Sequence, residues 1–226
     1  GKSPQLIRID LGRPSETETI DLANPPPTLS RDGSFVSCLH KVHVDPTGRH
    51  VIVSTITGDN FYVFIGTLPS GVSPSRKAKA LNRLKGAVIE SVAWSSSASM
   101  TTFSTKEILL GTANGHILET VLLDPTLSES SAFSLPVPGR SGAPERYLKQ
   151  IYALRERDAV TGLSCEIWGR RAIIFIATKT RLYQFVGSLS SKREDEGGML
   201  EGMMQPYNLG EVQPSEICSF AISWFK

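Results

Sequence analysis

Residues that can bind a metal ion lie close together at Cys38, His40 and His43. Thiolate and imidazole groups are common zinc ligands. The two histidines stand three positions apart in a run that alternates like a β-strand, so their side chains are expected on opposite faces. The sequence holds no second ligand pair at the spacing of a zinc site. We therefore expect no metal here, and no cofactor elsewhere in the chain.

A carboxylate precedes a Thr-Gly pair in Asp45-Pro46-Thr47-Gly48. An aspartate can act as a nucleophile that forms an aspartyl phosphate, but the nucleotide-site residues that this chemistry needs are not recognisable elsewhere. A β-turn explains all four residues, because Asp hydrogen-bonds the backbone ahead, Pro presets φ and Gly accepts a positive φ. We predict a turn. The sequence also lacks Gly-x-Ser-x-Gly, a phosphate-binding loop and His-Glu-x-x-His, and we predict that the chain is not an enzyme.

A basic strip lies between two predicted elements, and we define it by Arg76, Lys77, Lys79, Arg83 and Lys85. Near an anionic membrane each basic residue contributes about 1 kcal/mol, so the strip is a candidate contact for acidic lipid head groups or an acidic partner. The alternative is that it maintains solubility and protects a sheet edge from pairing. The net charge of +2, from 24 basic and 22 acidic residues, argues against a dedicated nucleic-acid binder.

Cysteine usage and hydropathy indicate the compartment. The cysteines, at positions 38, 165 and 218, are odd in number and far apart, as is typical of a reducing environment. The longest apolar run, Ala172–Ala177, is six residues long, far below the ~20 that span a bilayer. Residues 1–4 are followed by no signal-peptide hydrophobic region. We expect a soluble, intracellular chain, and peripheral contact with a membrane stays open.

The elements that position these residues are short strands separated by turns. From position 40 to 64 the apolar pattern predicts a three-stranded antiparallel meander, with Val42 and Val44 on a buried face. The pattern recurs from 88 to 122 and from 162 to 185. We predict a first strand over Gln5–Leu11 and outer strands over Leu81–Gly86 and Lys149–Leu154. We also predict loops over 13–37, 66–80, 95–105, 124–146 and 187–216, and a fourth unit beginning with Ile217–Trp224.

The units share a register: two apolar residues and a small residue precede Thr55, Thr112 and Thr178, which are spaced by 57 and 66 positions. Repeated antiparallel units of this kind predict an all-β fold, a β-propeller with WD40-like blades, of which the chain supplies about three and a half. Residues 1–226 would then be the amino-terminal portion of a single propeller domain in a partial ring. The alternative is a β-sandwich. Trp94, Trp168 and Trp224 are expected to pack between blades.

Several stretches, taken in order, also resemble one family. They are Leu6–Gly12, His40 to Gly48, Lys85 to Trp94, Gly111–Glu119 and Ile176–Gly187. The chain resembles the amino-terminal β-propeller of the vacuolar protein sorting-associated protein 18 family, also called the Pep3 or deep orange family, and its loop lengths resemble fungal members.

The resemblance implies a non-catalytic subunit of the HOPS and CORVET tethering complexes. Such a subunit would act with other HOPS/CORVET subunits, and indirectly with Rab GTPases and SNARE proteins, in vesicle fusion. It would be cytoplasmic and peripheral on late endosome and vacuole or lysosome membranes. The family's later α-solenoid and zinc-binding RING domain do not occur in this chain, and no catalytic residue carries over. The alternative is a propeller scaffold of another assembly, such as a coat or a nuclear complex.

Overall fold

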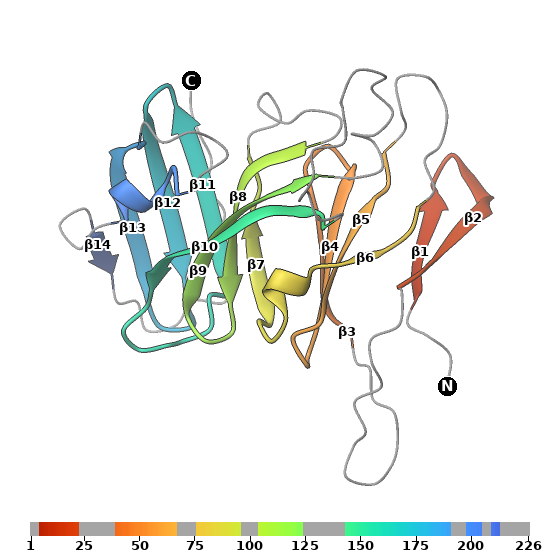
Figure 1. Ribbon diagram of the computed structural model, residues 1–226, viewed down its shortest axis with the longest axis horizontal. Coiled ribbons are helices and arrows are strands. Elements are labelled where there is room, and N and C mark those ends of the chain that lie inside the picture. Colours follow the sequence, from red (N-terminus) through yellow and green to blue (C-terminus); the bar gives the residue numbers. More distant parts are fainter. Residues whose placement is uncertain are drawn as a thin grey trace, which may run out of the picture. The chain divides into compact units, whose positions relative to one another are not determined.

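The computed structural model describes residues 5–22, 39–66, 76–95, 104–123, 143–190, 198–204 and 209–212. These residues form strands and two short 3₁₀ helices, and every strand pairing is antiparallel (Figure 1). Within these described ranges, three sheets have four strands each and a fourth sheet is a two-stranded hairpin. The chain divides into two compact units, Gly1–Val88 with Asp124–Pro144 and Ile89–Leu123 with Glu145–Lys226. The prediction of an all-β chain is confirmed.

The first unit contains one four-stranded sheet in chain order, and every residue of its two middle strands is buried. Its strands are β3 (Leu39–Val44), β4 (His50–Thr55), β5 (Asn60–Phe64) and β6 (Lys79–Ala80).

The predicted outer strand over Leu81–Gly86 is wrong. The edge strand is β6, and the following residues form the 3₁₀ helix η1 (Asn82–Leu84). The reason is the buried amide of Asn60, which donates from Nδ2 to the carbonyl oxygens of Leu84 at 2.9 Å and Ala87 at 2.8 Å. These bonds hold the segment as a turn beside β5 instead of an extended strand.

The first unit also contains a hairpin of β1 (Gln5–Asp10) and β2 (Arg13–Asp21). The strand predicted over Gln5–Leu11 is confirmed, whereas the loop predicted over 13–37 is wrong at its start. The polar composition of β2 hid a strand whose residues are nearly all exposed, apart from the buried Ile20. The Asp10 Oδ1 atom accepts the backbone N–H of Gly12 at 2.9 Å and stabilises the turn.

The second unit contains two four-stranded sheets, the second and third sheets of the chain. The second consists of β7 (Ile89–Ala93), β8 (Ser104–Thr112), β9 (His116–Leu123) and β10 (Glu145–Ala153). The third consists of β11 (Gly162–Trp168), β12 (Arg171–Ala177), β13 (Leu182–Ser188) and β14 (Leu209–Val212).

One face of the third sheet packs on the second sheet. The core between them includes Leu109, Ile117, Leu163, Ile174 and Ile176, and β11 lies against β7. The loop predicted over 187–216 is wrong in part, because it contains β14 and the 3₁₀ helix η2 (Glu201–Met203). Leu200, Met203 and Met204 are buried in the same core, which explains why this segment is ordered.

In each of the three four-stranded sheets, the shared threonine caps the turn between the second and third strands. Thr55, Thr112 and Thr178 are each almost completely buried at or just beyond the end of a second strand. The Thr112 Oγ1 atom accepts the N–H of His116 at 2.9 Å and donates to its carbonyl oxygen at 3.1 Å. Thr55 makes the same pair of bonds with Asp59, at 2.9 and 3.0 Å. Thr178 accepts the N–H of Arg181 at 3.1 Å. The repeat predicted from sequence is therefore a repeated cap on the turn between the second and third strands.

Three apolar side chains that were expected to be buried are exposed. Trp168 is 48% exposed, and Val42 and Val44 are 45% and 50% exposed, so their expected burial is wrong in this chain. The predicted fourth unit at Ile217–Trp224, which includes Trp224, lies outside the described residues, as do Cys38 and Cys218.

Candidate functional site

The residues that first suggested metal binding lie on the edge of the first sheet. His40 and His43 are partly buried on β3, and Cys38 lies outside the described residues. Within the described part of the chain, no three His, Cys, Asp or Glu side chains are grouped closely enough to hold a metal ion. Cys165 is a free thiol whose pKa is raised to about 12, chiefly by burial and then by the charges of Glu166 and Glu119.

Asp45 forms the predicted turn, which is confirmed. Its carboxylate is 3% exposed and accepts backbone N–H groups from Thr47 at 2.8 Å, Arg49 at 2.6 Å and His50 at 2.5 Å. The Thr47 hydroxyl also donates to it, and Gly48 has the positive φ of 66° that this turn requires. Burial by itself would raise the pKa of Asp45, but the hydrogen bonds together lower it below 3.8. The carboxylate is thus engaged by its own turn.

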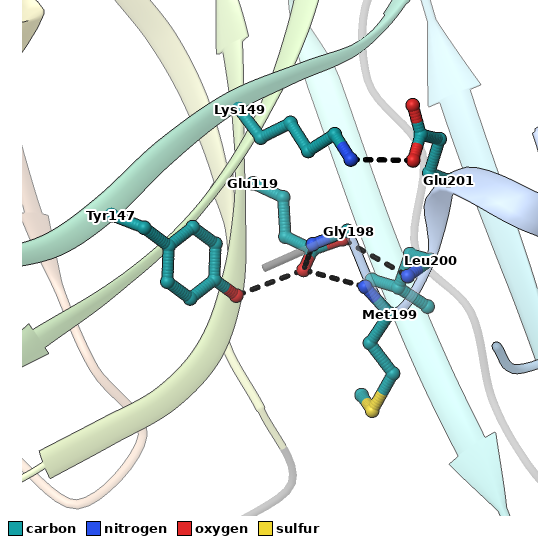
Figure 2. Close-up of polar contacts among 7 residues, drawn as sticks. All are labelled: Glu119, Tyr147, Lys149, Gly198, Met199, Leu200 and Glu201. Atoms are coloured by element: carbon teal, nitrogen blue, oxygen red, sulfur yellow. Dashed lines mark hydrogen bonds and ion pairs between the residues drawn. The ribbon is translucent and has the colours of Figure 1, made fainter. Parts of the chain in front are cut away.

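A second buried carboxylate, Glu119, has no counterpart in the sequence-based predictions. It lies on β9 and is 0% exposed. Figure 2 shows that the Tyr147 hydroxyl on β10 and a segment beyond β13 converge on it. The Oε1 atom accepts the Tyr147 hydroxyl at 2.8 Å and the N–H groups of Gly198 at 2.8 Å and Met199 at 3.0 Å. The Oε2 atom accepts the N–H of Leu200 at 3.0 Å.

These four donors satisfy both oxygens of the buried carboxylate. Three successive backbone N–H groups that point at one anion form a concave anion-binding arrangement. The pKa of Tyr147 is raised by burial and by the negative charge of Glu119. Gly198 has a φ of 81°, and a Cβ atom there would approach the Lys149 Nζ to 2.7 Å. This positive φ is a backbone conformation that glycine adopts readily, and it occurs where the backbone N–H donates to Glu119.

An ion pair lies beside the hydrogen bonds to Glu119, at a position that is partly exposed to solvent. The Lys149 Nζ atom on β10 lies 2.6 Å from the Glu201 Oε2 atom of η2 (Figure 2). We call Glu119, Tyr147, Lys149 and residues 198–201 the Glu119 clasp. It joins the second sheet to the segment that follows β13 of the third sheet. Because every Glu119 oxygen is hydrogen-bonded and the side chain is buried, the arrangement suits a structural tie and not acid–base catalysis.

The clasp left a weak signal in the sequence. Glu119 is the only charged residue in the run His116–Leu123, which is otherwise apolar apart from His116 and Thr120. An isolated charge in a strand that is apolar on both sides must find a compensating partner when it is buried. That signal indicates a buried polar contact but does not identify the partners.

The members of the basic strip differ in exposure and in ion pairing. Arg76 forms an ion pair with Glu18, and its side chain is 9% exposed. Its pKa is lowered by burial and by the nearby Arg8, which lies 3.6 Å from the same carboxylate. Lys79 is partly buried on β6, and the three other members of the strip are exposed: Lys77, Arg83 and Lys85. The contact predicted for the strip with an acidic surface stays a prediction. Along the described ranges, no helix has the length and apolar character needed to cross a bilayer.

The fold and the polar contacts together define the class of protein. Four-stranded antiparallel meanders follow one another. Buried Asp45 and Thr112 stabilise turns, and buried Glu119 joins the second sheet to the segment that follows β13. This is the architecture of a β-propeller module. The chain belongs to the Pep3/Vps18/deep orange beta-propeller family, whose family model matches residues 2–223. The predicted propeller fold and the predicted family are confirmed.

Similar proteins come from distant organisms. The chain is 31% identical over 196 residues to the "Vacuolar protein sorting-associated protein 18 homolog" of Danio rerio, with 85% of this chain and 17% of that protein covered. It is 33% identical over 233 residues to "Vacuolar sorting protein 18" of Arabidopsis thaliana, with 97% and 19% covered. The chain thus spans less than a fifth of these relatives. Among solved structures, the Cps50 (Swd1) β-propeller domain of Myceliophteria thermophila is 16% identical with a TM-score of 0.45, over 85% of this chain and 52% of that one.

Proposed function

We propose that this chain is a non-catalytic β-propeller module in a subunit of a HOPS/CORVET-type tethering complex. Residues 1–226 would be the amino-terminal portion of a single propeller domain in that subunit. The observation that carries the proposal is the family match over residues 2–223. Support also comes from the relatives in Danio rerio and Arabidopsis thaliana, whose names refer to vacuolar protein sorting. The subunit acts in vesicle tethering and fusion at endosomes and the vacuole or lysosome.

In this role the module works by presenting a rigid surface to protein partners. Its buried polar residues, Asp45 and Glu119 among them, are engaged in turns and in the clasp, which favours scaffolding over catalysis. The partners are the other tethering subunits and, through them, Rab GTPases and SNARE proteins. The complex lies on the cytoplasmic side of late endosome and vacuole membranes as a peripheral assembly.

Isolation of the tagged full-length protein from its own cells tests the proposal. The expected result is that the other HOPS and CORVET subunits are recovered with it in near-stoichiometric amounts. A scaffold of a coat or nuclear complex would instead bring down those subunits, and that result, or recovery of no tethering subunit at all, would overturn the proposal. A variant with Arg13→Ala, at an exposed site, serves as a control for handling and expression.

The exposed members of the basic strip are the part of this surface that we propose to meet acidic lipid head groups. Reversal of Lys77, Arg83 and Lys85 to Glu should reduce binding to vesicles containing phosphatidylserine by at least about 100-fold, since each basic residue contributes about 1 kcal/mol and the new carboxylates are repelled. The matched control reverses Arg49, Arg155 and Arg170, which are also exposed. Equal losses in both variants would mean that net charge alone is responsible, and no loss in the first would remove the strip from the proposal.

A further inference from the structure

Arg157 has a backbone conformation that an arginine rarely adopts. Its φ of 56° lies in the left-handed region, which is disfavoured for side chains other than those of Asn and Asp. The residue belongs to the link between β10 and β11, residues 154–161, in the second unit (Figure 1). Its backbone N–H donates to the carbonyl oxygen of Leu154 at 3.2 Å. Strain of this kind persists where the surrounding structure imposes it, and it is common at functional sites.

The first unit has a glycine at the equivalent position. Gly86, in the link between β6 and β7, has a φ of 88°. It lies against the turn between β4 and β5, where a Cβ atom on Gly58 would approach the Gly86 carbonyl carbon to 2.6 Å. Arg157 lies in the same way against the turn between β8 and β9, where a Cβ atom on Gly115 would approach the Arg157 Cα atom to 2.9 Å. Glycine adopts this conformation without steric cost, so the geometry of the link does not explain the arginine.

Contacts of Glu156 place a second turn beside this link. The Glu156 Oε2 atom accepts the Tyr183 hydroxyl at 3.1 Å, and its Oε1 atom lies 3.2 Å from the Arg181 Nη1 atom. Arg181 ends the turn between β12 and β13, which also contains the exposed Lys179. The link and the two turns, from β8–β9 and β12–β13, therefore lie together at one end of the sheets of the second unit.

The link and the β12–β13 turn have an excess of positive charge. Apart from the ion pair just described, the exposed charged residues there are Arg155, Arg157, Lys179 and Asp158. Among the described residues none of these four forms an ion pair. Three basic groups and one acidic group are thus left to interact with solvent or with a partner. We call Arg155, Arg157 and Lys179 the Arg157 surface.

We propose that the Arg157 surface binds an acidic peptide segment of a partner protein, in which a carboxylate pairs with the Arg157 guanidinium. A guanidinium presents two parallel N–H donors that match a carboxylate, and such charge-assisted pairs are the strong ones. A partner that needs this guanidinium accounts for an arginine where the repeat accommodates glycine. Asp158 lies next to Arg157 in the chain, so the positive charge is not continuous. Spaced carboxylates of a peptide fit that pattern better than a planar anionic membrane does.

This inference rests on the proposed function in one respect, because it names a kind of partner for the rigid surface of the module. The two can fail separately. Recovery of tethering subunits with the tagged protein tests the proposed function, whereas binding of an acidic peptide tests the Arg157 surface. A protein that recovers those subunits but does not bind the peptide would overturn the inference alone.

Fluorescence anisotropy with the full-length protein and fluorescein-labelled octaglutamate tests the inference. The measurement is made in about 50 mM NaCl, where screening of charges is weak. Arg157→Gly should weaken binding of the peptide by at least about five-fold, because one charge-assisted hydrogen-bonded pair is lost. The same substitution should leave the Tm equal to that of the wild type or raise it, because glycine relieves the positive φ.

Arg170→Gly is the matched control. It removes the same charge from the exposed turn between β11 and β12, at the opposite end of β12, and should change peptide binding by less than about two-fold. Equal losses in the two variants would mean that net charge alone is responsible, and would overturn the inference. So would an unchanged affinity in Arg157→Gly, or a loss confined to phosphatidylserine vesicles. A lower Tm in Arg157→Gly would also overturn it, because Arg157 would then be needed by the fold.

Discussion

Asp45 and Glu119 are both buried carboxylates, but their partners lie at very different distances along the chain. The donors to Asp45 are all within five positions of it. Those to Glu119 lie from 28 positions away, at Tyr147, to 81 positions away, at Leu200. Asp45 shapes the turn between β3 and β4, whereas Glu119 joins the second sheet to a segment of the third.

The difference teaches how this fold uses buried charge. A carboxylate that bonds to its own turn needs only local ordering, which costs little loop entropy. A carboxylate that draws in a segment 80 residues later fixes two sheets at once, and its loss leaves several buried donors unsatisfied. If distance along the chain sets the loss of stability, substitution of Glu119 should cost more than substitution of Asp45.

The largest loss of stability is expected for Glu119→Gln. The amide turns its NH₂ group toward backbone N–H donors, so at least one buried N–H among Gly198, Met199 and Leu200 loses its acceptor. We expect a loss of about 2–4 kcal/mol in the stability of the propeller, measured by urea titration with pulse proteolysis of the intact protein. The exposed Glu16→Gln serves as control, because Glu16 makes a surface ion pair with Arg13 and should change stability by less than about 0.5 kcal/mol.

A smaller loss of stability, about 1–2 kcal/mol at pH 7, is expected for Asp45→Asn. The pKa of Asp45 in the folded chain is below its ordinary value of 3.8. Its stabilisation is therefore complete above about pH 3.8 and is lost as the pH falls through the folded pKa. The stability difference between the wild type and Asp45→Asn should be constant from pH 7 to 5 and shrink below pH 4. A difference that grew on acidification would contradict the assigned hydrogen bonds.

The threonine caps should each contribute less. Replacement of Thr112 by Val removes the bonds to the backbone of His116 and should cost about 1 kcal/mol. Thr55→Val should cost a similar amount, since the two caps are alike. Thr17→Val on the exposed face of β2 is the control and should be neutral. Unequal losses at Thr55 and Thr112, beyond about 1 kcal/mol, would break the equivalence of the repeated turns.

The smallest loss of stability is expected at the ion pair of Lys149 with Glu201, which is the partly exposed part of the clasp. The Lys149 and Glu201 side chains are 31% and 36% exposed, so solvent and salt screen their ion pair. Lys149→Ala should cost about 0.5 kcal/mol at low salt and less in 0.5 M NaCl, as followed by the same urea titration. A loss as large as that of Glu119→Gln would show that Lys149, and not the row of backbone N–H groups, holds the clasp together.

Local patterns explain what could be predicted from the sequence. The turn at Asp45–Gly48 and the caps at Thr55, Thr112 and Thr178 involve residues a few positions apart, so composition and spacing indicate them directly. The buried strands around these threonines were also predictable, because runs such as Ala172–Ala177 are apolar. The family resemblance rests on the same repeated elements.

Features that depend on distant residues could not be predicted. The strand β2 is almost wholly polar, and it is a strand because β1 pairs with it and Ile20 packs on the first sheet. The segment from Gly198 to Met204 is glycine- and methionine-rich, and the partner that orders it, Glu119, lies about 80 positions earlier. Val44 is 50% exposed although it alternates with polar neighbours, because alternation indicates the two faces of a strand and not what packs on either face.

Amide hydrogen exchange at Gly198, Met199 and Leu200 tests most directly the claim that Glu119 ties two sheets together. In the intact wild-type protein these amides should be protected, because each donates to the buried carboxylate. In Glu119→Gln their protection should fall by at least about ten-fold, while in Asp45→Asn it should stay at the wild-type level. Unchanged protection in Glu119→Gln, or an equal loss in both variants, would contradict the account.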